Sequence, residues 1–216
     1  MPGLNFRVTK VEPAARGLVP LLHFHVEVTN SPETELIQAV LLQAQIQIQS
    51  AHRPYDDLEK EKLVDLFGTS DRWGQTLRNR LWTHAHGTVR QFSGSTETIL
   101  PVLCTFDLNV SATKYFYALK EGIIPLLFLF SGTVFYIAQD GRLQVEQIAW
   151  DKECTYQLPV QIWQALMDHH YPNSAWVCLH RHVFDKLYAY KLRQGLQTWE
   201  QTIERLLANY DSLPSR

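Results

Sequence analysis

Residues 123–148 read Ile-Ile-Pro-Leu-Leu-Phe-Leu-Phe-Ser-Gly-Thr-Val-Phe-Tyr-Ile-Ala-Gln-Asp-Gly-Arg-Leu-Gln-Val-Glu-Gln-Ile. An apolar run opens this stretch, and Asp140-Gly141 separates it from a second run of alternating apolar residues. A tight turn that matches the twist of two strands needs positive φ, which Gly adopts without a steric penalty. The stretch therefore predicts a β-hairpin in a buried antiparallel sheet, with Gly132 as a bend or bulge inside the first strand.

Alternating apolar and polar residues predict further strands on the N-terminal side of this hairpin. The predicted strands cover residues 5–12, 22–29, 37–50, 81–92, 96–103 and 105–110. A change to a period of about 3.6 predicts a helix over residues 56–67, which Gly68 ends. An irregular or helical piece around Trp73 and a short helix through Tyr115 are the other interruptions.

The pattern after Trp150 becomes mostly helical. Apolar spacing predicts helices over residues 160–170 and 183–194, and Thr198-Trp-Glu-Gln201 resembles a capping box that opens a last helix to Tyr210. We expect an α+β fold with an antiparallel β-sheet or sandwich core and helices mainly at the C-terminus. Residues 1–216 are predicted to form a single domain, mostly β over 1–150, with the mostly helical 151–216 packed on the sheet.

The composition is that of an ordinary globular protein without a polyanionic partner. The 216 residues include 20 Lys+Arg and 22 Asp+Glu, so nucleic acid is not an expected partner. The start lacks the pattern of a secretory signal, and no apolar run approaches the roughly 20 residues of a membrane-spanning helix. Three widely spaced cysteines form no disulfide or metal motif. We therefore expect a cytoplasmic protein that does not insert into a membrane.

The nine histidines suggest a metal site more strongly than any other residue type. His84 and His86 lie two apart on a predicted strand, so both imidazoles share one face and could bind one metal ion. A third ligand at a recognisable spacing is missing, and solvated or hydrogen-bonded His is the more common reading. We expect no metal and no cofactor, and His84 and His86 are the candidates if that prediction is wrong.

Catalytic motifs are also missing from the sequence. Cys104, Cys154 and Cys178 lie in no nucleophile motif, and a buried thiol commonly acts as a small apolar side chain. The carboxylates of the helix at 56–67, which include Asp56 and Glu59, are interpreted as the solvated opening of that helix. No residue is therefore proposed as catalytic.

A row of glutamines marks the predicted strand over 37–50. Gln43, Gln45, Gln47 and Gln49 alternate with apolar residues, so all four side chains point away from the core. Such a row can be a solvated face, an edge that pairs with another strand, or a contact face for a partner. The four glutamines are the candidate partner-binding residues.

An ordered set of short motifs resembles an uncharacterised bacterial domain-of-unknown-function family. The set comprises Arg53-Pro-Tyr55, Leu66-Phe-Gly68, Arg72-Trp73, Leu81-Trp82, Lys114-Tyr115, Ile124-Pro-Leu126, Phe130-Ser-Gly-Thr-Val-Phe135, Trp150-Asp151 and Thr198-Trp-Glu200. The resemblance spans nearly the whole chain. Members of that family occur in actinobacteria and related bacteria, often beside genes for NiFe hydrogenases and their accessory proteins, which implies an accessory role without assigning catalytic residues.

These observations together predict a non-catalytic binding or assembly factor. The expected partner is a protein, and the resemblance implies hydrogenase subunits or accessory proteins. The alternative is a His-based metal-handling protein or a metal-dependent enzyme.

Overall fold

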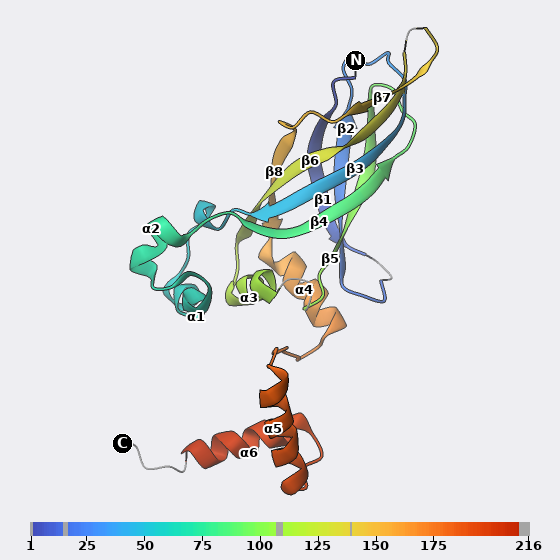
Figure 1. Ribbon diagram of the computed structural model, residues 1–216. Helices are drawn as coiled ribbons and strands as arrows, with labels where there is room; N and C mark the ends of the chain where they lie inside the picture. The colour runs from blue at the N-terminus through green and yellow to red at the C-terminus, as the bar shows by residue number, and fades with distance from the viewer. Residues whose placement is uncertain (1, 15–16, 107–109, 139, 212–216) are drawn as a thin grey trace. The chain divides into compact units, whose positions relative to one another are not determined.

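A computed structural model describes residues 2–14, 17–106, 110–138 and 140–211 (Figure 1). The chain divides into two compact units, Met1–Ser174 and Ala175–Arg216. The first unit contains the strands β1 (Asn5–Pro13), β2 (Leu21–Thr29), β3 (Ile37–Ile48), β4 (Arg80–Val89), β5 (Ser95–Leu103), β6 (Ile123–Ile137), β7 (Leu143–Gln147) and β8 (Glu153–Pro159). Its helices are α1 (Asp57–Phe67), α2 (Trp73–Thr76), α3 (Val110–Ala118) and α4 (Val160–His170).

The second unit contains α5 (Arg181–Arg193) and α6 (Trp199–Asp211). The predicted capping box at the start of α6 is confirmed: the Gln201 backbone N–H donates to Thr198 Oγ1 at 3.2 Å, and the Thr198 N–H donates to Gln201 Oε1 at 3.3 Å. Packing of α5 and α6 on the sheet stays a prediction. None of the helices in the described residues is long and apolar enough to cross a membrane.

The strands form two antiparallel sheets, which confirms the predicted fold class. Sheet A has the order β1-β2-β5, and sheet B has the order β4-β3-β6-β7 with β8 also paired to β6. Strand β3 therefore lies between β4 and β6, so the interpretation of its glutamines as a strand-pairing edge is wrong. Figure 1 shows α1, α3 and α4 at one end of the sandwich and the β6–β7 turn at the other.

The predicted hairpin is the β6–β7 pair. Ala138 N–H donates to the Arg142 carbonyl at 2.9 Å, and Gly141 occupies the turn with φ of +79°. Gly132 lies inside β6 with φ of +141°, and a Cβ there would stand 2.0 Å from the Leu41 carbonyl oxygen. Glycine at this position is therefore required by the close approach of β3, as the prediction of a backbone role implied.

The core lies between the two sheets and is rich in aromatic rings. Phe24 of β2 lies 5.2 Å from Phe128 of β6 and 6.2 Å from Trp82 of β4, measured between ring centroids. Phe6 of β1 stacks on Phe130 of β6 at 4.6 Å. These contacts join both sheets, so side chains of β6 supply much of the apolar surface that holds the sandwich together.

Two segments differ from their sequence-based predictions. Residues 153–159 form β8 on β6, a strand that the sequence did not predict, because the local pattern is weak and only Leu158 is buried. Val110, predicted to end a strand, begins α3 instead. Residues 107–109 of that predicted strand lie outside the described residues.

The outer face of sheet A carries a ladder of ionic contacts. His25 on β2 lies between two carboxylates, with Nδ1 2.9 Å from Glu97 Oε1 and Nε2 2.9 Å from Glu12 Oε1. Lys10 also pairs with Glu12, and Arg7 pairs with Glu27 at 2.7 Å. The hydrogen bond with Glu97, and then that with Glu12, raises the pKa of His25 against the opposing effect of burial.

Replacing Phe128 by Ala should lower the free energy of unfolding by about 3 to 5 kcal/mol, the usual cost of deleting a buried aromatic ring. Phe128 is fully buried, whereas Phe135 on the same strand is only partly buried. Chemical denaturation of Phe128→Ala and Phe135→Ala variants tests this, and the second variant should lose clearly less. A loss below about 1 kcal/mol for Phe128→Ala would show that the ring is not in the core.

Stability should also depend on the protonation of His25. Because the folded-state pKa is raised above the unfolded value of about 6.5, the His25 contribution is present below that pH and is lost as pH rises through the folded pKa. The stability difference between wild type and His25→Gln should therefore be larger at pH 5.5 than at pH 8.5. A difference that is constant across this range, measured by denaturant titration, would contradict the assignment.

Candidate functional site

The outer face of sheet B brings together the two sets of residues that the sequence singled out. Across β4, β3 and β6, one row of the register is His86, Gln43 and Ser131, and the next is His84, Gln45 and Leu129. Both histidines are exposed, and both glutamines are half-buried between their neighbours. The candidate metal ligands and the candidate partner-binding residues thus lie side by side on one surface.

The other two glutamines have different positions. Gln47 lies on the same face in a row with Leu81 and Leu127. Gln49 follows the end of β3, and its backbone N–H donates to the Pro125 carbonyl at 2.9 Å. The glutamine row on the strand is therefore three residues long.

We define the sheet B face by the outward residues of β3, β4, β6 and β8. They are Leu41, Gln43, Gln45, Gln47, Leu81, His84, His86, Thr88, Leu127, Leu129, Ser131, Thr133, Glu153, Thr155 and Gln157. Within this set, Glu153 is the one residue that is Asp, Glu, Lys or Arg. The outer face of sheet A, by contrast, is crossed by ion pairs. The two faces of one sandwich therefore differ in chemistry, and only the sheet B face is almost free of charge.

A shallow hollow of about 460 Å³ lies on the sheet B face. Gln43, His86, Thr88 and Thr133 contribute polar groups to it, and Leu41 contributes an exposed apolar side chain. This mixture of hydrogen-bonding and apolar groups can receive a side chain of a protein partner.

A metal site at His84 and His86 finds no support in the geometry. Among residues 2–14, 17–106, 110–138 and 140–211, no group of three or more His, Cys, Asp or Glu is arranged to hold a metal ion. The residues of β3 that lie opposite the two histidines are glutamines. His86 and His84 lie opposite Gln43 and Gln45 on this face.

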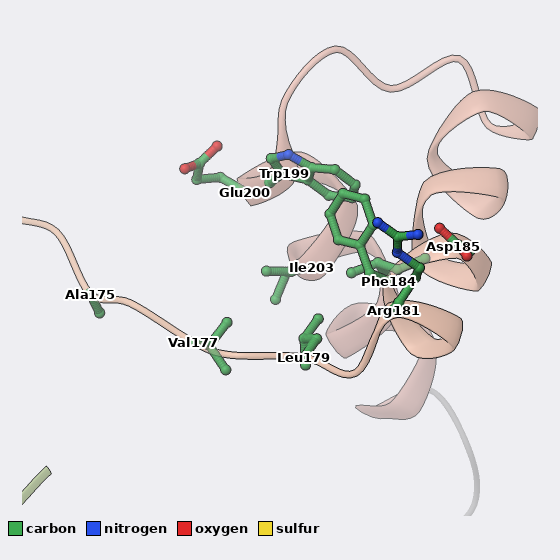
Figure 2. Close-up of a pocket in the computed structure, with 10 residues that line it drawn as sticks. Ala175, Val177, Leu179, Arg181, Phe184, Asp185, Trp199, Glu200 and Ile203 are labelled. Carbon is green, nitrogen blue, oxygen red and sulfur yellow. The ribbon is translucent and has the colours of Figure 1, made fainter. Parts of the chain in front are cut away.

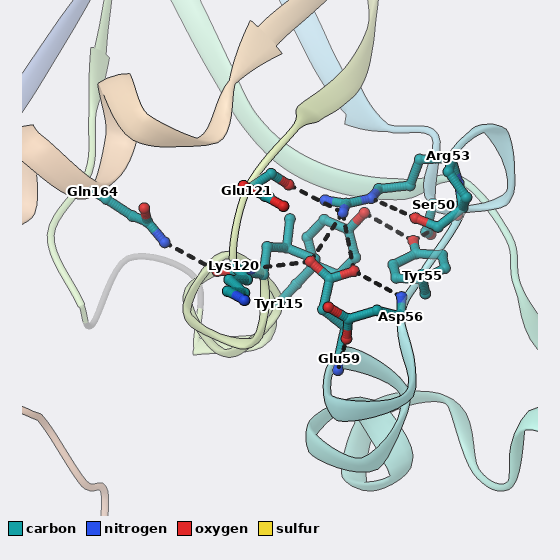
Figure 3. Close-up of polar contacts among 11 residues, drawn as sticks. Ser50, Arg53, Tyr55, Asp56, Glu59, Tyr115, Lys120, Glu121 and Gln164 are labelled. Carbon is teal, nitrogen blue, oxygen red and sulfur yellow. Dashed lines mark hydrogen bonds and ion pairs between the residues drawn. The ribbon is translucent and has the colours of Figure 1, made fainter.

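A buried ionic cluster lies at the helical end of the sandwich, where the sequence predicted a solvated carboxylate (Figure 3). Glu59 on α1 is 4% exposed, and both of its carboxylate oxygens lie 3.0 Å from Arg53 Nη2. The Lys120 backbone N–H donates to Glu59 Oε1 at 2.9 Å. The prediction for Glu59 is wrong because Lys120, which follows α3, is far away in the sequence and closes over the carboxylate.

Two tyrosines extend the ionic cluster. Tyr55 Oη donates to the Ser50 carbonyl at 2.6 Å and lies 2.9 Å from Tyr115 Oη. Burial raises the pKa of both hydroxyls, so neither Tyr55 nor Tyr115 is prepared to act as a base near neutral pH.

The role of the ionic cluster is structural. The side chains of Arg53 and Glu59 are 7% and 5% exposed, and Tyr115 is fully buried, so a dissolved substrate cannot reach the reactive atoms. The Arg53 guanidinium also donates to the Glu121 carbonyl at 3.3 Å. The cluster therefore fastens the segment before α1 to the segment after α3.

Part of this cluster was visible in the sequence. The pattern Asp56-x-x-Glu59 is a capping-box signature, and the Glu59 N–H donates to Asp56 Oδ1 at 2.7 Å. The partners at Tyr115 and Lys120 had no local signal.

Two of the three thiols, those of Cys104 and Cys154, are buried or half-buried. Burial raises the pKa of Cys104 to about 12, and it also raises the pKa of Cys154. Such thiols are protonated near neutral pH and react poorly. Cys104 is buried in the apolar core, in agreement with its interpretation as a small apolar side chain.

A second hollow lies within the unit Ala175–Arg216 (Figure 2). It has a volume of about 730 Å³ and is lined mainly by apolar side chains that include Val177, Leu179, Phe184 and Ile203, with Arg181 and Glu200 also lining it. In residues 175–210 of this unit, Thr202 alone is buried. The unit therefore presents its apolar side chains at its surface.

Comparison with known proteins assigns no activity to these surfaces. A family model described as a family of unknown function, DUF6084, matches residues 1–214. No curated protein matches the chain.

Three solved structures show weak likeness to the chain. A candidate ApaA protein from Bordetella pertussis is 12% identical over 73% of this chain and 95% of that chain, with a TM-score of 0.30. A candidate late embryogenesis abundant protein is 15% identical over 74% and 73%, with a TM-score of 0.31. β-Glucosidase 3B from Thermotoga neapolitana is 10% identical over 72% and 17%, with a TM-score of 0.26. These TM-scores are too low to inform the function of this chain.

Replacing Glu59 by Gln should destabilise the protein by about 3 to 5 kcal/mol, because the change keeps the shape of the side chain but leaves the buried Arg53 guanidinium without its counter-charge. Glu61→Gln, on the exposed side of the same helix, is the matched control and should stay within about 0.5 kcal/mol of wild type. Denaturation midpoints of the two variants decide the matter. Equal, small effects would show that the ionic cluster does not hold this end of the sandwich.

Proposed function

The chain belongs to this family of unknown function, and we propose that it is a non-catalytic binding or assembly factor that holds a protein partner on the sheet B face. The observation that carries this proposal is the contrast between the two outer faces of the sandwich. Sheet A exposes paired charges, while sheet B exposes glutamine, histidine, serine, threonine and leucine with one carboxylate.

The chemistry of the sheet B face suits a protein interface. Burying an unpaired Lys or Glu costs far more free energy than burying a Gln whose amide finds a hydrogen-bond partner. The centres of protein interfaces are accordingly depleted of charged side chains. Gln43, Gln45 and Gln47 can therefore bond to a partner's backbone or polar side chains, and Leu41 and Leu81 add exposed apolar area.

The size of the face also fits part of an interface. Four strands about 4.8 Å apart and seven residues long give a flat area of roughly 400 Å². A standard interface covers about 800 Å² on each partner. The sheet B face can supply the centre of such an interface, with neighbouring segments as its rim.

The partner class in this proposal comes from the family resemblance. A hydrogenase subunit or a hydrogenase accessory protein, in the cytoplasm, is the first protein to look for. The sheet B face favours a partner whose contact surface is uncharged, and the identity of that partner comes from the resemblance alone.

Replacing Gln45 and Gln47 together by Lys should reduce recovery of the partner tenfold or more in affinity purification from the native host, because two ammonium groups would be desolvated at the centre of the interface. The matched control replaces His23 and Thr29 by Lys, since both are half-buried outward residues of β2, the central strand of sheet A. The control should recover the partner as wild type does, and both variants should keep the wild-type unfolding midpoint.

Unchanged recovery with the Gln45 and Gln47 variant would eliminate the sheet B face as the binding surface. Recovered proteins that include no hydrogenase component, together with normal hydrogenase activity in a deletion strain, would eliminate the proposed partner class while leaving the binding surface intact.

A further inference from the structure

The helix α6 carries an unusually complete apolar stripe. Trp199, Ile203, Leu206, Leu207 and Tyr210 recur at the spacing that places them on one side of a helix. The exposed fraction is 44% at Ile203, 38% at Leu206, 58% at Leu207 and 73% at Tyr210. The stripe is therefore least covered at its C-terminal end, at Leu207 and Tyr210.

The neighbouring helix α5 covers only the start of this stripe. The ring of Trp199 lies 5.2 Å from that of Phe184 and 6.0 Å from that of Tyr188. Lys191 Nζ lies 5.7 Å from the centroid of the Trp199 ring. The hairpin thus closes around Trp199 and leaves most of the other large apolar side chains of both helices at the surface.

A unit of this size needs an additional contact to be stable. Chains of about 40 residues bury too little apolar surface to fold alone without disulfides, metals or association with another surface. The described residues of this unit contain no disulfide, because its one cysteine, Cys178, is free. They also contain no group of three or more His, Cys, Asp or Glu that could hold a metal ion. Something must therefore cover the apolar stripe.

The charges of the two helices are complementary. Between Arg181 and Arg193, α5 carries four Lys and Arg against one Asp, a net charge of +3. Between residues 199 and 210, α6 carries two Glu against one Arg, a net charge of −1. By helical geometry Glu200 and Glu204 flank the apolar stripe, whereas Arg205 lies on the opposite side of α6. No ion pair joins the described residues of this unit, so its charges, apart from that of Lys191 over the Trp199 ring, are open to a second surface.

We propose that the α5–α6 hairpin is a dimerisation element that pairs with the same hairpin of a second copy of this chain about a twofold axis, forming a four-helix bundle. In this arrangement the two α6 helices run antiparallel. Leu207 and Tyr210 of each copy then enter the hollow of the other copy beside Ile203 and Val177. The same pairing sets Glu200 and Glu204 of one copy beside the cationic α5 of the other.

This arrangement accounts for two separate observations. An antiparallel pair of α6 helices, each 13 residues and about 20 Å long, places the most exposed half of one stripe over the hollow at the other. A twofold axis needs a surface that is complementary to itself, and a basic α5 beside an acidic flank of α6 provides that. The proposal is independent of partner binding at the sheet B face.

Light scattering coupled to gel filtration on the full-length chain tests the proposal. Wild type should elute as a species of about 50 kDa, twice the 25.0 kDa of one chain. Replacing Leu207 and Tyr210 together by Glu should give a species of about 25 kDa at the same concentration. Because both side chains are exposed, this variant should keep the unfolding midpoint of the β-sandwich.

A control matched in charge replaces Arg205 by Gln and Ala208 by Glu. These residues lie on the side of α6 away from the stripe, and the net charge changes by the same two units as in the first variant. The control should stay dimeric, which would separate loss of the apolar contact from a general effect of negative charge.

Three results would overturn the proposal. A wild-type chain that is monomeric up to about 200 µM would show that another surface covers the hairpin, and amide exchange would then reveal whether α6 is protected within a single chain. A dimer that survives the Leu207 and Tyr210 changes would place the interface elsewhere. Loss of the dimer in the control would show that the stripe is not the determinant.

Discussion

The pairing of β6 with strands on both of its sides is the constraint on which the rest of the first unit depends. A strand with Ile124, Leu126, Phe128 and Phe130 in the core has no water to satisfy its backbone N–H and C=O groups. Strand β3 satisfies one side of β6 along nearly its full length. Strands β8 and then β7 satisfy the other side. The 15 residues of β6 therefore recruit three partner strands and decide the order of sheet B.

This order explains where the candidate surface lies. Because β3 is held between β4 and β6, its glutamines cannot meet another strand at an edge, and they become the middle of a flat face. The register then sets Gln43 and Gln45 beside His86 and His84. Two groups of residues that are about 40 positions apart in the sequence thus form one surface.

The charged cluster and the uncharged surfaces of this protein differ in burial. The Arg53–Glu59 pair has the charge and the hydrogen bonds of a site, but it is enclosed, and its donors come from segments that it fastens together. The sheet B face and the apolar stripe of α6 are accessible and have almost no charge at their centres. Buried charge in this protein thus joins segments within the fold, whereas accessible uncharged surface is available for association.

The sequence alone was sufficient for the local elements whose signals are short-range. Asp140-Gly141 predicted the hairpin, the alternation around Gln45 predicted an outward glutamine row, and Thr198-Trp-Glu-Gln201 predicted the start of α6, because turn geometry, strand period and capping each depend on a few neighbouring residues. Only the tertiary structure decided that residues 153–159 form a strand, that β3 is central, and that Glu59 is buried. Those outcomes depend on partners far away in the sequence, such as Lys120 for Glu59 and β6 for β8. Pairing and burial are set by which distant backbone groups and charges meet in the folded chain, and no local pattern of residue types records that.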